Sequence, residues 1–335
     1  MRAVAESEPP RLPGPLPTQS VGVIICTRDR PADLDRCLAS FKDQSLCPSE
    51  IIVVDNASRD DATRHVVSKH NVLYVREENP GLCYARNCGL ATAKSEIVAF
   101  TDDDTVLHRD WLLNLVSAFD DESIWATTGL ILPAELNSLS QCVFEKVWGF
   151  SRGFKRRDFG PGFYAQTRGR GCPVWEIGAG ASMAFRSRIF EKTGPFDVRL
   201  DAGRSGCSGD SELWYRILHA GGVCRYTPDS VLFHYHRNTE SELRKQIRAY
   251  MRGHVSALLV QYKETGDRGN LRRAFWSLPR WYLRQLWACA IRPRSSGTCM
   301  VREEIRGCFE GIAYYWKVRN TPAWSDFNQS SSISR

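Results

Sequence analysis

Residues 97–104 read Ile-Val-Ala-Phe-Thr-Asp-Asp-Asp, four apolar side chains that lead through a threonine into three consecutive carboxylates. This pattern is typical of a buried parallel strand, and open α/β sheets bind their ligands at the carboxyl ends of such strands. Three adjacent like charges repel one another unless a cation lies between them, and oxygen-only ligands on a loop favour Mg²⁺ or Mn²⁺ over zinc. Taken alone, such a run is more often a solvated acidic loop, so its interpretation depends on the rest of the chain.

The segments before this stretch repeat one order of strand and helix. Strands are predicted over residues 21–26, 50–54 and 72–76, and a helical pattern follows each of them. The first of these helices begins near Pro31, a residue that suits the first turn of a helix. This alternation over about 85 residues predicts a doubly wound, mostly parallel sheet.

Polar side chains follow the predicted strands at one edge of that sheet. They are Thr27, Asp55, Asn79 and the carboxylates of residues 102–104. Together they predict a polar crevice that suits a nucleotide. No glycine-rich phosphate loop follows the first strand, so the nucleotide is expected to be held by side chains and a metal ion.

Four pieces of sequence occur in the order typical of a known family. They are the first strand with its threonine, Val-Val-Asp-Asn at 53–56, Ala-Arg-Asn-Cys-Gly at 85–89, and Asp-x-Asp at 102–104. This ordered set resembles the donor half of family 2 glycosyltransferases of the GT-A fold, and the resemblance extends over about residues 20–237. It implies an α/β fold in which a GT-A (Rossmann-like), mostly parallel sheet is sandwiched by helices, with a helical C-terminal appendage.

A second acidic motif lies at residues 208–216. It resembles the family pattern G-E-D-x-D-L-x-x-R, with Gly209 in place of the glutamate and Glu212 in place of the second aspartate. The resemblance implies that Asp210 is the catalytic base. A plain helix N-cap would explain Asp210 equally well from the sequence alone.

The resemblance also implies the ligands of the metal and of the donor. Asp104 and His234 are implied to bind Mn²⁺ or Mg²⁺, although a histidine after a strand is usually a structural residue. The implied donor-binding residues are Thr27, Asp55, Asn79, Arg86, Asp102 and Asp103.

These residues imply an inverting, metal-dependent glycosyltransferase. It would move one sugar from a nucleotide-diphosphate sugar to an acceptor hydroxyl, such as that of a lipid-linked sugar, in the synthesis of cell-surface polysaccharide, glycolipid or a related glycoconjugate. A sugar-phosphate nucleotidyltransferase is an alternative, but it usually has a glycine-rich segment with a lysine after the first strand, and residues 27–31 contain no glycine. A non-catalytic nucleotide-sugar-binding protein is the second alternative, although both Asp210 and the Asp-x-Asp are present.

The charge of the chain is concentrated near its end. The formal net charge is +7 over 335 residues, but residues 236–335 contain 18 Lys and Arg against 8 Asp and Glu, a net +10, and the rest sums to −3. Helices are predicted at 240–262, 271–290 and 301–316, and tryptophans alternate with arginines in 276–287. This composition suits a helix on an anionic membrane surface, with packing against the catalytic domain as the alternative. Nucleic acid is not expected as a partner.

The chain is predicted to have four segments: a disordered Pro-rich N-terminus at 1–19, a GT-A catalytic domain at 20–237 (donor half 20–130, acceptor half 131–237), a basic helical region at 238–320 and a disordered tail at 321–335. Within the acceptor half, residues 133–172 are predicted to form a long loop, which either faces the acceptor or packs on its own aromatic side chains. The twelve cysteines include no C-x-x-C pair, and no apolar run reaches the length of about 18 residues that spans a bilayer. The sequence therefore predicts a cytoplasmic protein with a peripheral contact to the inner face of the membrane.

Overall fold

The structure is a computed structural model that describes residues 19–291 and 300–324. All of the predicted N-terminal segment except its last residue, and residues 325–335 of the predicted tail, lie outside this description. The strands are β1 Val21–Thr27, β2 Glu50–Asn56, β3 Leu73–Glu77, β4 Ile97–Asp102, β5 Thr105–Leu107, β6 Ile124–Pro133, β7 Arg157–Phe159, β8 Ser182–Arg186 and β9 Val223–His234.

The α-helices are α1 Pro31–Ala39, α2 Ala62–Val67, α3 Leu82–Thr92, α4 Trp111–Ser117, α5 Leu139–Trp148, α6 Pro161–Thr167, α7 Phe190–Thr193, α8 Gly209–His219, α9 Glu240–Thr265, α10 Arg268–Arg272, α11 Leu278–Ile291 and α12 Val301–Val318. A π-helical segment, Arg273–Ser277, joins α10 to α11.

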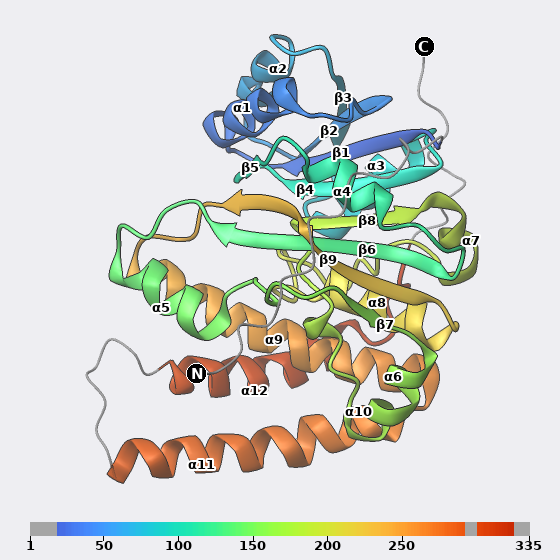
Figure 1. Cartoon of the computed structure of the whole chain (residues 1–335). Coiled ribbons are helices and arrows are strands. Elements are labelled where there is room, and N and C mark those ends of the chain that lie inside the picture. The colour runs from blue at the N-terminus through green and yellow to red at the C-terminus, as the bar shows by residue number, and fades with distance from the viewer. Residues whose placement is uncertain (1–18, 292–299, 325–335) are drawn as a thin grey trace, which may run out of the picture.

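The described strands form one sheet in the order β3-β2-β1-β4-β8-β6-β9-β5, with β7 paired beside β9 (Figure 1). The first four strands in this order are parallel, β8 is antiparallel to both β4 and β6, and β9 runs parallel to β6. The α/β fold with its mostly parallel first half is therefore confirmed. The residue pattern also predicts two short strands at 224–227 and 231–233, and this prediction is wrong, because the two segments form the single strand β9 with a register shift against β6 between them.

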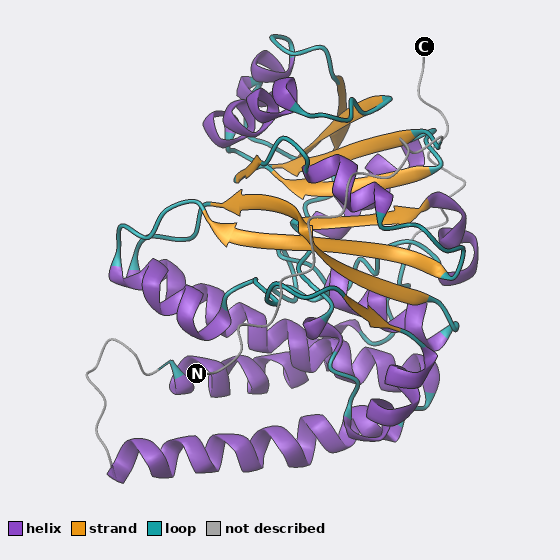
Figure 2. Cartoon of the chain, viewed as in Figure 1, coloured by secondary structure: helices purple, strands orange, loops and turns teal. Residues whose placement is uncertain are grey.

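Alternate side chains of the central strands face two different helical layers. On one face, Val23 and Ile25 of β1 pack in a cluster with residues of α1, α2 and α4. On the other face, Ile24 and Cys26 pack with residues of α3 and α8. Every residue of β1 is buried, as expected for a parallel strand covered on both sides (Figure 2).

The loop predicted over residues 133–172 is wrong where α5, β7 and α6 form. A capping box begins α5: the backbone N–H of Gln141 donates to the Ser138 hydroxyl, and the Gln141 side chain accepts from the Ser138 backbone. Phe144 of α5 then packs against His236 and Tyr250, with ring centroids 4.7 and 6.3 Å apart. This helix is thereby fixed beside the end of β9.

The helices after β9 form a separate layer beneath the sheet, and α11 is its outermost member (Figures 1 and 2). Leu258 and Leu259 of α9 pack with Tyr282 of α11 and Val301 of α12. The chain then returns to the sheet layer, where the Val198 N–H donates to the Ala323 carbonyl at 2.8 Å. None of the helices in the described ranges is both long and apolar enough to cross a membrane, and the described cysteines are free thiols.

Candidate active site

Of the three consecutive carboxylates, Asp102 ends β4, and Asp103 and Asp104 form the turn that leads into β5. Because β5 pairs antiparallel with β9 and places Thr105 opposite His234, this turn lies against the end of β9. The Asp104 carbonyl also accepts a hydrogen bond from the Tyr235 N–H at 3.0 Å. Strand pairing thus brings His234 to the acidic turn from a distant part of the sequence.

Asp102, Asp104 and His234 form a group that fits a divalent cation. One side-chain ligand atom from each lies within 4.8 Å of the others. His234 Nε2 is 3.3 Å from Asp104 Oδ1, and this buried oxygen has no hydrogen-bond partner among the described residues. Burial acts to raise the pKa of Asp104, but the charges of His234 and Arg30 outweigh it and hold that pKa well below its usual range. Oxygen and imidazole ligands of this kind suit Mn²⁺ or Mg²⁺.

Asp103 is not part of this group of possible metal ligands, because its carboxylate is fully buried and contacts Thr27 and Arg30. The Thr27 hydroxyl donates to its Oδ2 at 2.6 Å, and Arg30 Nη1 lies 3.1 Å from its Oδ1. The same Arg30 nitrogen is 2.6 Å from Asp104 Oδ2. Burial raises the pKa of Asp103 to about 7, partly offset by Arg30. Sequence analysis missed Arg30, which supplies part of the positive charge that the acidic turn requires.

His236 and Glu145 lie behind His234 and orient its ring. His234 Nδ1 is 3.1 Å from His236 Nδ1, and His236 Nε2 is 3.0 Å from Glu145 Oε2 on α5. Burial, together with the charge of His234, lowers the pKa of His236 to about 4. A chain of this kind fixes which ring nitrogen of a ligating histidine faces the ion. Sequence analysis missed both residues, although the spacing His234-Tyr235-His236 places two imidazoles on one face of an extended segment.

A cavity of about 900 Å³ opens beside the acidic turn, and Arg86, Asp102 and Asp210 line one end of it. Arg86 is buried, its Nη2 lies 4.0 Å from Asp102 Oδ1, and it makes no hydrogen bond with the described residues. A Cβ atom built on Gly180 would lie 2.6 Å from Arg86 Nη2 and 2.9 Å from Asp210 Oδ2. Because Gly180 has no side chain, the Arg86 guanidinium and the Asp210 carboxylate both face the small space beside it.

Asp210 lies in the first turn of α8 and is not its N-cap. The N-cap is Ser208, which has a left-handed backbone (φ 82°) and makes no side-chain cap. Asp210 Oδ1 accepts from the Ser211 N–H at 2.7 Å, and its Oδ2 has no hydrogen-bond partner in the described chain. Gly209 departs from the family pattern for a steric reason: a Cβ there would collide with Cys83 Sγ and lie 2.5 Å from the Leu200 carbonyl oxygen.

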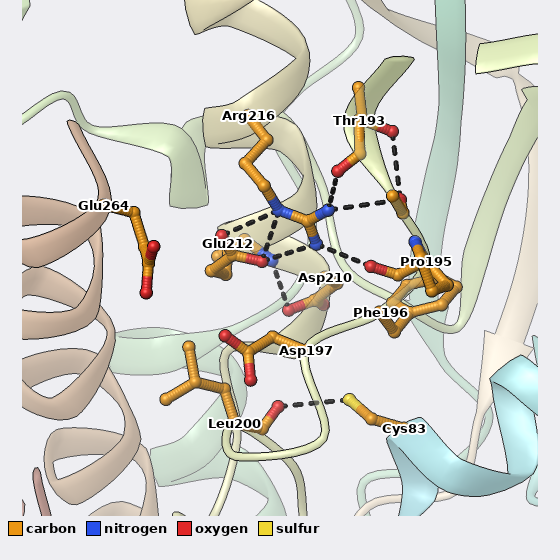
Figure 3. A network of polar contacts seen from close by, with 12 residues as sticks. Cys83, Thr193, Pro195, Phe196, Asp197, Leu200, Asp210, Glu212, Arg216 and Glu264 are labelled. Carbon is orange, nitrogen blue, oxygen red and sulfur yellow. Dashed lines mark hydrogen bonds and ion pairs between the residues drawn. The ribbon is translucent and has the colours of Figure 1, made fainter. Parts of the chain in front are cut away.

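The remaining motif residues of α8 have a structural role (Figure 3). Glu212 is buried and pairs with Arg216 at 2.7 Å. The Arg216 guanidinium also donates to the carbonyls of Thr193, Gly194 and Pro195. These bonds hold the segment before the 196–208 loop, so the pair positions the loop that leads into Asp210.

The predicted donor residues Asp55 and Asn79 lie at the ends of β2 and β3, outside the cavity lining. Asp55 is buried and accepts from the Tyr74 hydroxyl at 2.8 Å and from Arg76 Nη1 at 3.1 Å. Asn79 is exposed, and its backbone and side-chain N–H groups donate to Glu77 Oε1. The structure therefore brings Arg86, Asp102 and Asp210 together at the cavity, while Asp55 and Asn79 lie farther along the sheet edge.

Asp201 is a further cavity residue that sequence analysis missed. It is buried in the loop before α8 and lines the cavity. Its Oδ1 accepts from the Gly203 N–H at 2.8 Å, whereas its Oδ2 has no partner among the described residues. Burial raises the pKa of Asp201. Only its position before a turn glycine in Asp-Ala-Gly distinguishes it in the sequence.

A mostly parallel sheet flanked by helices, followed by a helical region, is the architecture of GT-A glycosyltransferases. The model of the family described as "Glycosyl transferase family 2" matches residues 22–191. The chain belongs to this family and is a glycosyltransferase.

Named relatives agree with this assignment. Glycosyltransferase AglE of Haloferax volcanii is 25% identical over 271 residues, which are 78% of this chain and 80% of that protein. The pre-mycofactocin glycosyltransferase of Mycobacterium tuberculosis is 26% identical over 270 residues, which are 78% of this chain but only 51% of that protein. A mannosyltransferase of Pyrobaculum calidifontis, solved in complex with GDP-Man and Mn²⁺, has a similar fold, with a TM-score of 0.60, 19% identity and coverage of 91% of this chain and 90% of its own.

Proposed function

We propose that this protein transfers one sugar from a nucleotide-diphosphate sugar to an acceptor hydroxyl with inversion at the anomeric carbon, and that it requires Mn²⁺ or Mg²⁺. The observation that supports this most strongly is the convergence of Asp102, Arg86 and Asp210 on one end of a cavity next to Asp104 and His234. The mannosyltransferase of Pyrobaculum calidifontis, which has a similar fold, was solved with GDP-Man and Mn²⁺, and this agrees with the proposal.

Each charged group has a separate role in this proposal. Asp104 and His234, with Asp102 beside them, would hold the divalent cation, which when bound neutralises charge on the departing diphosphate. Arg86 binds the diphosphate, because its guanidinium is buried at the cavity and makes no other hydrogen bond with the described residues. Asp103 and Thr27 hold the acidic turn through their 2.6 Å hydrogen bond.

Asp210 acts as the general base. The acceptor oxygen forms a bond to the anomeric carbon as the bond from that carbon to the diphosphate oxygen breaks, and the acceptor proton passes to Asp210 Oδ2. This oxygen is suited to the role because it makes no hydrogen bond within the described chain. Attack opposite the leaving group inverts the anomeric configuration.

The nucleoside would lie over the ends of β2 and β3. Asp55 positions Arg76 there, and Asn79 is exposed at the same edge. Release of a nucleoside diphosphate from a nucleotide sugar, dependent on Mn²⁺ or Mg²⁺, is the experiment that tests the proposed reaction.

We also propose that α11 and the π-helical segment bind an anionic membrane surface, such as the inner leaflet of a cell membrane. Trp276, Leu283 and Trp287 are 64%, 67% and 71% exposed, so the described chain does not bury them. Together with Arg280 and Arg284 they line one shallow groove. Exposed tryptophan and leucine between arginines suit the boundary between headgroups and acyl chains.

Replacing Arg280 and Arg284 together with glutamine is expected to weaken binding to vesicles of phosphatidylcholine and phosphatidylserine about 30-fold, because each arginine near an anionic surface contributes about 1 kcal/mol. Co-sedimentation measures this, and binding should fall as salt rises. The matched control replaces Arg64 of α2 and Lys69, which lies just after that helix, at the opposite end of the molecule (Figure 1), and should bind like the parent. Equal recovery of the parent with neutral and anionic vesicles would overturn the proposal.

A further inference from the structure

The π-helical segment Arg273–Ser277 contributes Arg273 and Ser277 to the lining of the same cavity. Segments of π-helix are rare and are often found at functional sites. This one separates its side chains into two groups: Arg273 and Ser277 line the cavity, whereas Phe275 and Trp276 belong to the exposed groove described above. The irregular helical geometry therefore places an arginine in the cavity and aromatic side chains on the outer surface.

Contacts on two sides fix the guanidinium of Arg273. Its Nε donates to His254 Nε2 at 3.1 Å, and its central carbon lies 4.0 Å from the centre of the Trp175 ring. The rings of Trp175 and His254 meet edge to face, with centroids 5.2 Å apart. Burial lowers the pKa of His254 to about 3, so the imidazole is neutral and accepts this hydrogen bond.

Arg273 makes no ion pair with any acidic residue in the described part of the chain, although it is largely enclosed. Burial lowers its pKa to about 10, an effect that a nearby carboxylate would oppose. Arg199, by contrast, is an enclosed arginine that lies 2.7 Å from the carboxylate of Asp197. Leaving a guanidinium enclosed without an anion is unfavourable, and a phosphate is a ligand that its planar donors fit well.

The two glutamates that line the same cavity are engaged with other groups. Glu304 Oε1 accepts from the Trp148 indole N–H at 3.2 Å, and Glu176 pairs with Arg157 at 2.9 Å. Neither glutamate forms an ion pair with Arg273.

The walls around Arg273 are mainly apolar. Trp148, Leu278, Trp281 and Tyr282 line the same cavity as Arg273. Trp281 is 54% exposed and lies on α11, so the apolar wall continues toward the outer face of that helix. A ligand that enters here meets aromatic surface on its way to the guanidinium.

We propose that Arg273, held by His254 and Trp175, binds a phosphate group of the acceptor, while an apolar part of the same molecule lies against the surrounding aromatic side chains. This inference rests on the proposed function, since it assigns the part of the cavity lined by Arg273 to the acceptor. The phosphate can belong to a lipid phosphate or to a small soluble phosphate ester, and both share this recognition chemistry.

The test compares three probes by titration calorimetry, in the presence of UDP or GDP with Mn²⁺: decyl phosphate, decanol and inorganic phosphate. Decyl phosphate is expected to bind the parent about ten- to a hundredfold more tightly than decanol, because charge-assisted hydrogen bonds form only with the phosphate. Arg273→Gln should lose this difference, and Arg273→Lys should keep part of it. The matched control is Arg272→Gln, which alters an exposed arginine one residue away and should bind like the parent.

The outcomes of this test distinguish a lipid phosphate from a soluble phosphate ester. They also distinguish failure of this inference from failure of the proposed function. Tighter binding of decyl phosphate than of inorganic phosphate, lost in Arg273→Gln, supports the inference and indicates a lipid phosphate. Equal binding of the two, also lost in Arg273→Gln, supports the phosphate contact, overturns the contact of an apolar part with the aromatic side chains and indicates a soluble phosphate ester. Equal binding of decyl phosphate and decanol, or equal binding of decyl phosphate to the parent and to Arg273→Gln with an unchanged melting temperature, overturns the inference. A parent that binds UDP or GDP with Mn²⁺ but no phosphate probe refutes only this inference, and a parent that binds no nucleotide refutes the proposed function itself.

Discussion

Asp210→Asn is expected to lower turnover about 10²- to 10⁴-fold while the affinity for the nucleotide stays close to that of the parent. Asparagine keeps the size of the side chain and the hydrogen bond from the Ser211 N–H, which is 2.7 Å long in the parent. It cannot accept the acceptor proton, so only the chemical step is affected. Single-turnover kinetics together with nucleotide binding measure the two effects separately.

The control is Asp229→Asn, the same change at an exposed aspartate outside the cavity lining, which should leave turnover as in the parent. Loss of nucleotide affinity in Asp210→Asn, with turnover per bound donor unchanged, would contradict the assignment of the base. That result would move Asp210 to the donor side of the site.

Asp104→Ala is expected to weaken Mn²⁺-dependent binding of UDP or GDP by about 100-fold or more, because even residues behind a metal ligand affect metal affinity by about 10- to 100-fold. The change removes the carboxylate that lies 3.3 Å from His234 Nε2 and leaves the arginine contact to Asp103 at 3.1 Å. Since Arg30 keeps one partner, the chain is expected to fold. Calorimetry with and without Mn²⁺ measures the effect, and circular dichroism checks the fold.

Asp43→Ala removes an exposed aspartate elsewhere on the surface and serves as the matched control for the loss of one carboxylate. It should bind nucleotide and Mn²⁺ like the parent. If Asp104→Ala also bound nucleotide as tightly as the parent in the presence of Mn²⁺, the assignment of the metal ligands would be wrong.

Local patterns predicted the first half of the sheet well. Strands buried on both faces read as continuous apolar runs, so β1, β2 and β4 were found within two residues of their observed bounds. The polar groups at their ends followed directly, because parallel strands deliver their carboxyl ends to one edge. The long helices α9, α11 and α12 were likewise visible in the sequence.

Features that depend on contacts between distant segments could not be predicted. Arg30 reaches Asp103 and Asp104 only because β1 and β4 are neighbours in the sheet. Glu145 meets His236 only because α5 packs beside β9. The helix α5 itself had a local signal, the capping box from Ser138 to Gln141, which the aromatic and basic residues after it obscured.

Gly209, which departs from the family pattern, is another case in which contacts between distant segments explain what the sequence alone does not. A sequence comparison registers a missing glutamate, whereas the structure gives the reason: Cys83 and Leu200 occupy the space of any side chain at that position. The irregular turn that places Arg273 in the cavity also has no local signal, because helical periodicity continues on both sides of it.

The central claim is that the cavity beside Asp104, His234 and Asp210 cleaves nucleotide sugars with inversion. NMR of the purified protein with α-linked UDP-glucose, GDP-mannose and dTDP-glucose tests it most directly. We predict that at least one of them releases its nucleoside diphosphate, that the sugar appears first as the β anomer, and that release stops when Mn²⁺ and Mg²⁺ are chelated and resumes when either is restored. Release of the α anomer, release that is unaffected by chelation, or no release from any donor would contradict the account.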